Sequence, residues 1–228
     1  MTTTHRAEVA IFGVAFAVFG LVVLALIWSG DWAYASLANL NGVRTVEFVR
    51  TGSTSLDTLL SYHRAWSDYV TGRSNFMAAN LGPVQIVFTA DEAAHMSDVR
   101  RVFIGAQIMA VVALGISAFR LVRARARGYA WRLLRDGGLA AAGLVVLIGL
   151  AAVVAFDQVF LLFHEVFFPQ GNFLFDPATS NLIRLYPEWY WQGITAGVGL
   201  SFVAVALLTA GAAHIALRRR SNTYTRAA

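Results

Sequence analysis

The 228-residue chain contains no cysteine and no lysine, and only 14% of its residues are charged. The absence of cysteine excludes disulfides, thiolate metal sites and cysteine nucleophiles. Hydrophobic residues make up 57% of the chain, whereas soluble domains contain roughly 45–50%. This composition argues against a soluble globular enzyme. It also excludes a disordered chain, because so many apolar side chains must be buried in a protein core or in a bilayer.

Four long uncharged segments favour the bilayer; they are residues 9–28, 102–119, 137–156 and 190–213. Each is close to the roughly 20 residues that a helix needs to cross a hydrocarbon core. The segments lack the alternation of polar and apolar residues that is typical of barrel strands, so helices are the structure that satisfies their backbone amides in lipid. We therefore predict an all-α, polytopic protein in which residues 1–228 form a single membrane domain with four transmembrane helices.

Arginines are distributed unequally between the two sides of these spans. Eleven of the 18 arginines lie in the two tails and in the loop 120–136, where the only acids are Glu8 and Asp136. That side has a net charge of +9, and the other side, with seven arginines and 11 acids, has −4, which together give the +5 of the chain. The positive-inside rule then places both termini in the cytoplasm. We expect the basic loop to contact lipid headgroups and not nucleic acid.

The first span also has features of a signal peptide. Ala33-Tyr34-Ala35 follows it and has the small residues of a cleavage site. The apolar run is 20 residues long, longer than the roughly 7–15 residues of a signal sequence core. We therefore expect a retained anchor; cleavage would leave three spans.

The outward-facing part of the chain comprises residues 31–101 and 157–188. Its first segment is predicted to be helical, because apolar residues recur at helical spacing: Leu59, Leu60, Tyr62, Trp66 and Tyr69. The middles of the spans carry no charged residue, which argues against a transporter. Gly193 and Gly197 form a small-xxx-small pair that predicts close packing of the fourth span against a neighbour.

The first informative histidine on the outer side is His95. Thr89 and Glu92 form the pattern of a capping box, which predicts a helix that begins there and runs unbroken into the second span. Asp91, Glu92 and Asp98 then lie one turn from His95, so one or two carboxylates can reach the imidazole and support its protonated form. A solvated, charge-paired histidine without a catalytic role is an equally open interpretation.

The second is His164, which lies in the apolar segment 157–168 that we expect to continue out of the third span. A histidine among Phe and Leu side chains is costly to bury unless it is paired, and Asp157 lies two turns earlier on the same helix face. A purely structural role for His164 remains open. Asp176, which precedes Pro177, is expected to be a turn or cap residue.

These residues resemble a known family. The patterns His95-Met96-x-Asp98-Val99 and Asp157-x-x-Phe160-x-x-Phe163-His164, and the spacing from Phe163 to Pro187-Glu188, are similar to those of the bacterial lipoprotein intramolecular transacylase (Lit) family of four-span membrane proteins. Phe173 and Ser180 depart from the residues that we expect in that family. The resemblance covers roughly residues 59–191.

The resemblance implies an enzyme that moves an acyl chain from the glycerol ester of a diacylglyceryl-cysteine lipoprotein to the α-amino group of that cysteine, on the outer leaflet. The implied catalytic residues are His95 and His164, with Asp98, Asp157 and Asp176 in supporting roles. No cofactor or metal is implied, although two histidines beside carboxylates are chemically able to bind zinc. The implied partners are lipidated lipoproteins and membrane lipids, in the bacterial plasma membrane.

Two alternatives stay open from the sequence. One is a non-catalytic membrane scaffold or chaperone that recognises a partner through the first outer segment. The other is a paralogous enzyme that acts on another lipid substrate. Convergence of His95 and His164 in space would favour an enzyme.

Overall fold

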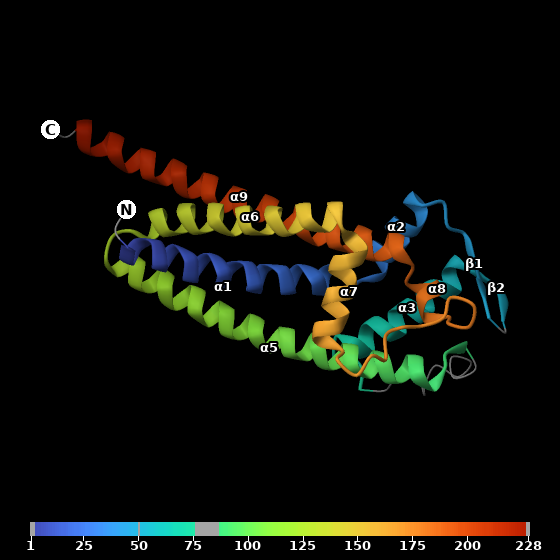
Figure 1. The fold of residues 1–228 in the computed structure, drawn as a ribbon. Coiled ribbons are helices and arrows are strands. Elements are labelled where there is room, and N and C mark those ends of the chain that lie inside the picture. Colours follow the sequence, from blue (N-terminus) through green and yellow to red (C-terminus); the bar gives the residue numbers. More distant parts are fainter. Residues whose placement is uncertain (1–2, 50, 76–86, 227–228) are drawn as a thin grey trace. The chain divides into compact units, whose positions relative to one another are not determined.

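The computed structural model describes residues 3–49, 51–75 and 87–226. Most of the chain is helical (Figure 1). The elements are α1 (Thr3–Trp28), α2 (Asp31–Leu40), β1 (Thr45–Phe48), β2 (Gly52–Ser55), α3 (Leu56–Val70), α5 (Ala90–Ala126), α6 (Ala130–Val154), α7 (Phe156–Phe167), α8 (Leu182–Leu185) and α9 (Glu188–Arg226).

Four of the described helices, α1, α5, α6 and α9, are long and apolar enough to cross a membrane. They contain three of the four predicted spans entirely and residues 137–154 of the third, so the all-α polytopic fold is confirmed. Helix α5 has 37 residues and is therefore about 55 Å long. A hydrocarbon core is only ~30 Å thick, so part of α5 must lie outside it. We assign that part to residues 91–101, which include the charged residues that precede the apolar run 102–119.

The chain divides into two compact units, and the first comprises residues 1–24, 107–153 and 198–228. Its helices pack through small residues, with Ala17, Ala141 and Ala206 buried around the ring of Phe202. A Cβ atom on Gly20 would lie 2.7 Å from that ring, so the helices approach each other more closely than larger residues would allow. Large apolar side chains on the outer faces, such as Val153 and Leu208, are exposed, as expected for contact with lipid.

The second unit comprises residues 25–106 and 154–197. Its core is aromatic and includes Tyr34 from α2, Trp66 from α3 and Tyr186 after α8. The two glycines of the predicted packing motif belong here. A Cβ on Gly193 would lie 2.4 Å from Leu37, and a Cβ on Gly197 would lie 2.4 Å from Trp28, so the predicted close packing is confirmed.

A short antiparallel hairpin, β1 and β2, was not expected in this unit. The side-chain amide of Asn181 holds its turn: Oδ1 accepts from the amide of Val49 at 2.7 Å and Nδ2 donates to the carbonyls of Val49 and Val87. Residues 157–168, which were expected to continue out of the third span, follow it as a separate helix. Ala155, with φ −143° and ψ 53°, interrupts the helix, and α7 begins at the next residue.

Candidate active site

The capping box at the start of α5 positions His95. The carboxylate of Glu92 accepts from the amide of Thr89 at 2.6 Å, and the Thr89 hydroxyl accepts from the amide of Glu92 at 3.2 Å. The other oxygen of Glu92 accepts from the Ser180 hydroxyl and the Leu182 amide. Glu92 is only 1% exposed, so these bonds fix the first turn of α5. His95 lies one turn further on, where it is buried.

His164 lies in the last turn of α7 and is half-buried among phenylalanine rings. Its Nδ1–H donates to the carbonyl of Phe160 at 2.8 Å. That bond fixes the neutral ring in the tautomer whose lone pair is on Nε2. The rings around it belong to Phe160, Phe163, Phe168 and Phe173, with centroid distances between 4.2 and 5.4 Å.

The two imidazoles lie side by side. Their ring centroids are 6.2 Å apart and their planes differ by 19°. Phe168 contacts both rings, at 4.9 Å from His95 and 5.4 Å from His164. The structure thus brings together the two histidines that are 69 residues apart in the chain.

The surroundings favour the neutral form of both rings. The pKa of His95 is lowered to about 4, chiefly by burial and also by the neighbouring His164 ring, although a contact with Asn172 opposes this. Burial also lowers the pKa of His164, although the bond to the Phe160 carbonyl opposes this. In addition, Nδ1 of His95 is buried without a hydrogen-bond partner among the described residues. At neutral pH the site therefore offers two uncharged nitrogen bases.

Asp98 connects α5 to the loop that encloses the histidines. It is buried, and its Oδ2 accepts from the side-chain amides of Gln170 and Asn172, both at 2.6 Å. Its Oδ1 pairs with the guanidinium of Arg101, whose side chain is 76% exposed. Among the described residues, the partners of Asp98 are thus Gln170, Asn172 and Arg101, whereas one or two of Asp91, Glu92 and Asp98 were expected to reach the imidazole of His95. The Asp98 carboxylate instead holds the loop that carries Phe168, Phe173 and Phe175.

Gln170 and Asn172 were missed by the sequence analysis. They flank Gly171, whose φ of +75° marks a tight turn. Pro169-Gln170-Gly171-Asn172 has turn-forming residues, so the turn was detectable from the sequence. The bonds of Gln170 and Asn172 to Asp98, which is more than 70 residues away, were not detectable from the sequence.

The two other predicted supporting residues lie at the edges of this region. Asp157 is exposed in the first turn of α7 and is about 10 Å along the helix from His164. The carboxylate of Asp176 is exposed and accepts from the amide of Ala178 at 2.8 Å. Asp176 therefore shapes a turn, as expected. Within the described residues, no group of three or more His, Asp or Glu side chains is arranged to hold a metal ion.

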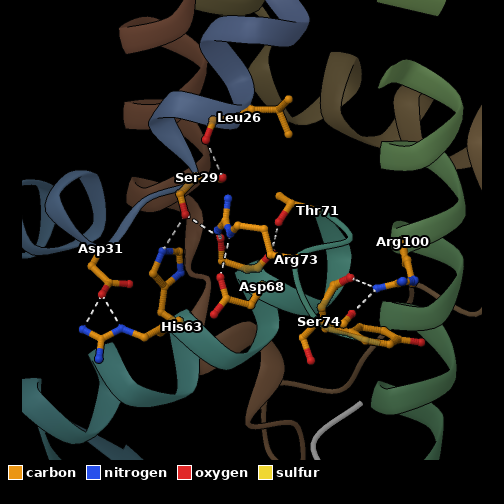
Figure 2. Close-up of polar contacts among 12 residues, drawn as sticks. Leu26, Ser29, Asp31, His63, Asp68, Thr71, Arg73, Ser74 and Arg100 are labelled. Atoms are coloured by element: carbon orange, nitrogen blue, oxygen red, sulfur yellow. Dashed lines mark hydrogen bonds and ion pairs between the residues drawn. The ribbon is translucent and has the colours of Figure 1, made fainter. Parts of the chain in front are cut away.

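A third histidine, His63, has a different environment. Its Nε2–H donates to the carbonyl of Ser29 at 3.2 Å (Figure 2). Its Nδ1 accepts from the Tyr186 hydroxyl at 3.3 Å. Burial lowers the pKa of His63, with the carboxylate of Asp31 opposing. The same carbonyl of Ser29 also accepts from the Ser67 hydroxyl at 2.6 Å. His63 thus joins the outer end of α1 to α3, and both of its ring nitrogens are used in doing so.

A cavity of about 510 Å³ lies beside the Asp98 network. It is lined by Asp98, Arg101, Val102, Phe167 and Gln170. Its wall combines two apolar side chains with a carboxylate, a guanidinium and an amide. Such a lining fits a molecule with one apolar and one polar end.

The fold and these residues define a helical, polytopic integral membrane protein that encloses a pair of histidines with aromatic rings. The sequence profile described as lipoprotein intramolecular transacylase Lit matches residues 9–191. The chain belongs to this family, as its motifs predicted.

Solved structures of the membrane integral lipoprotein intramolecular transacylase Lit from Bacillus cereus have the same fold. One aligns with a TM-score of 0.70 at 15% identity and covers 100% of both chains. A form with one histidine changed to arginine aligns with a TM-score of 0.70 at 14% identity, covering 96% of this chain and 95% of that one. A form with a histidine changed to alanine gives 0.71 at 13% identity and 96% of each chain. None of the curated proteins compared matches the sequence.

Proposed function

We propose that this chain is an enzyme that moves an acyl chain from the glycerol ester of a diacylglyceryl-cysteine lipoprotein to the α-amino group of the same cysteine. Membership of the family supports the class of reaction and the lipoprotein substrate. The observation that carries the proposal is the convergence of His95 and His164, with ring centroids 6.2 Å apart. Two adjacent neutral imidazoles suit a reaction that needs proton transfer at two atoms.

The proton balance of the reaction accounts for two bases. The amide C–N bond forms and the ester C–O bond breaks, so the acyl group changes its partner while the total mass stays the same. The substrate's ammonium loses two protons: one ends on the glycerol oxygen and the other is released. One histidine takes the first proton and exposes the amine lone pair. The other takes the second proton during attack and returns it to the leaving alkoxide.

The lowered pKa values bear on how the two histidines divide the work. In such a reaction a protonated histidine can stabilise the tetrahedral oxyanion. Because burial favours both neutral rings, the proposed imidazolium forms only when the substrate delivers its ammonium proton. The lone pair of His164 for this transfer is on Nε2, because its Nδ1–H is bonded to Phe160. On His95, Nδ1 is buried and has no hydrogen-bond partner among the described residues. Once formed, the charge is next to the reacting carbonyl.

We infer that the site faces the outside of the bacterial plasma membrane and that both termini are cytoplasmic. The unequal distribution of arginine supports this orientation. On the inferred cytoplasmic side, the two acids are both paired with bases: Glu8 with Arg120 at 2.9 Å, and Asp136 with His5 and Arg135. Arg123, Arg125 and Arg127 near the loop of that side are exposed, so they can meet anionic headgroups.

Mass spectrometry of the amino-terminal lipopeptide tests the reaction directly. Cells that lack any N-acylating enzyme would express the unmodified chain, the His164→Ala variant or the His214→Ala variant as a matched control. We expect an N-acyl, mono-acyl-glyceryl cysteine of unchanged total mass with the unmodified chain and with the control. The product should fall at least about 100-fold in His164→Ala.

Fragmentation locates the acyl chain on nitrogen or on glycerol and so separates isomers of equal mass. Unrearranged diacylglyceryl-cysteine in all three strains, with the proteins folded in the membrane, would contradict the proposal for that substrate. Product in His164→Ala at the level of the control would remove His164 from the mechanism while leaving the reaction intact.

A further inference from the structure

A second cavity, of about 390 Å³, lies between the first turn of α5 and the loop that ends at Ser180. Its walls include Thr89 and Asp91 from the start of α5, and Asn172, Phe175 and Asp176 from the loop. This volume is within the range of about 300–1,000 Å³ that is typical of ligand sites. The proton transfers proposed above do not use this cavity.

The cavity shares walls with the enclosure of the histidines. Phe175 lines it and also contacts the ring of His95, at a centroid distance of 5.5 Å. Asn172 lines it too and donates to Asp98. A molecule bound in the cavity is therefore separated from His95 by a single layer of side chains.

The two cavities lie on opposite sides of His95 along α5. It is lined by Asp91, whereas the 510 Å³ cavity is lined by Val102, where the uncharged run begins. At 1.5 Å per residue these two residues are about 16 Å apart along the helix axis, with His95 between them. The 510 Å³ cavity is thus on the membrane side of His95, and the 390 Å³ cavity is on the side away from the apolar run.

The charge of the cavity is acidic. Asp91 and Asp176 are both exposed, and among the described lining residues there is no arginine or histidine. Arg184 lies near in sequence, but its guanidinium donates to the carbonyls of Glu47 and Pro177. Of the three hydroxyl groups in the wall, those of Thr179 and Ser180 donate to the Asp176 carbonyl and to Glu92, whereas that of Thr89 is able to donate to a peptide backbone.

We propose that this cavity binds the polypeptide segment that follows the modified cysteine, and that Asp91 and Asp176 favour substrates with basic side chains in that segment. The inference rests on the proposed function, because a lipoprotein has its acyl chains in the membrane and its polypeptide outside. The reacting cysteine then lies beside His95, with its lipid on one side and its polypeptide on the other. The cavity is in this way a determinant of which lipoproteins are modified.

The test uses the purified full-length protein in detergent with two diacylglyceryl-cysteine lipopeptides, which carry either two lysines or two glutamates directly after the cysteine. We expect kcat/KM to be about fivefold higher for the basic peptide at low ionic strength, as two exposed charge contacts allow. High salt should reduce the preference. The ratio of kcat/KM for the two peptides should fall to near unity in the Asp91→Asn, Asp176→Asn double variant, because both charges are removed. Asparagine is chosen because its side chain can also accept the hydrogen bond from the amide of Ala178.

Asp57→Asn is the matched control, because Asp57 is an exposed first-turn carboxylate of α3 that does not line the cavity. Equal kcat/KM for the two peptides, or a preference that survives in the double variant, would overturn the inference while the proposed function stands. If neither peptide is converted, the proposed function fails, and the binding affinities of the two lipopeptides then decide about the cavity. Equal affinities would overturn the inference about the cavity. Tighter binding of the basic peptide by the unmodified protein, but not by the double variant, would support that inference.

Discussion

Replacing Asp98 with asparagine should loosen the loop over the histidines. In the structure one carboxylate oxygen accepts from two side-chain amides, of Gln170 and Asn172, at 2.6 Å each. Hydrogen bonds to a charged group contribute about 1.5–3 kcal/mol and neutral ones about 0.5–1.5 kcal/mol. Loss of the charge should therefore lower the free energy of unfolding by about 2 kcal/mol in total. The pair with Arg101 adds little, since that side chain is mostly exposed.

The assay is thermal unfolding of the purified protein in detergent, followed by intrinsic fluorescence. For a chain of this length, 2 kcal/mol corresponds to a decrease in Tm of about 4–8 °C. Arg101→Gln is the matched control, because it removes the ion pair and leaves both amides bonded to the carboxylate. We expect its Tm to change by less than about 2 °C. Transacylation by Asp98→Asn, measured on folded protein, should also fall, because the loop positions Phe168 around both rings.

Two results would refute this reasoning. A Tm of Asp98→Asn equal to that of the unmodified protein would mean that the two amides do not depend on the carboxylate charge. Equal decreases in Asp98→Asn and Arg101→Gln would assign the effect to the ion pair instead of the loop. In either case Asp98 would no longer explain how the enclosure of the histidines is held.

Three further predictions concern His63, His95 and Gly197 of the second unit. His63→Ala should lower stability by about 2–4 kcal/mol, seen as a lower Tm, because it leaves the Ser29 carbonyl without one donor and opens a cavity; an unchanged Tm would contradict this. Burial lowers the pKa values of His63 and His95. In the unfolded chain these two histidines become protonated near pH 6.5, and in the folded protein only at lower pH. Protonation therefore favours the unfolded chain, and Tm should fall as the pH drops from 7 to 5. A Tm that rises over this range would be inconsistent with buried neutral rings. Gly197→Ala should cost about 1–3 kcal/mol by its clash with Trp28, whereas Gly199→Ala, where nothing lies within 4 Å, should be neutral or stabilising; similar Tm values for the two variants would argue against the close packing.

The features that the sequence predicted are those with local causes. The spans follow from the length and composition of four apolar runs. The start of α5 follows from Thr89 and Glu92, which are three residues apart and bond to each other as a capping box. Helix α3 follows from apolar residues at helical spacing, of which Leu59 and Trp66 are fully buried. In each case the interaction that forms the structure is contained within a few turns of chain.

The features that the sequence did not predict depend on distant contacts or on small backbone changes. Ala155 interrupts the helix in a run of Ala, Val and Phe that contains no helix-breaking residue. The hairpin depends on Asn181, which is 132 residues away from Val49. From their helical spacing, one or two of the carboxylates Asp91, Glu92 and Asp98 were expected to reach His95. In the folded chain, Gln170 and Asn172 are bonded to the carboxylate of Asp98 instead.

The three histidines of the second unit, His63, His95 and His164, show how the hydrogen bonds of the ring nitrogens separate a structural role from a chemical one. All three have lowered pKa values from burial, so the direction of the shift does not distinguish them. His63 uses one nitrogen as a donor and the other as an acceptor, so taking up a proton would break its bond with Tyr186. His164 uses only the nitrogen that carries its proton, and the buried Nδ1 of His95 has no partner among the described residues. Only the latter two rings can accept a substrate proton without losing a hydrogen bond that holds the fold, and this is the reason why we assign the chemistry to them.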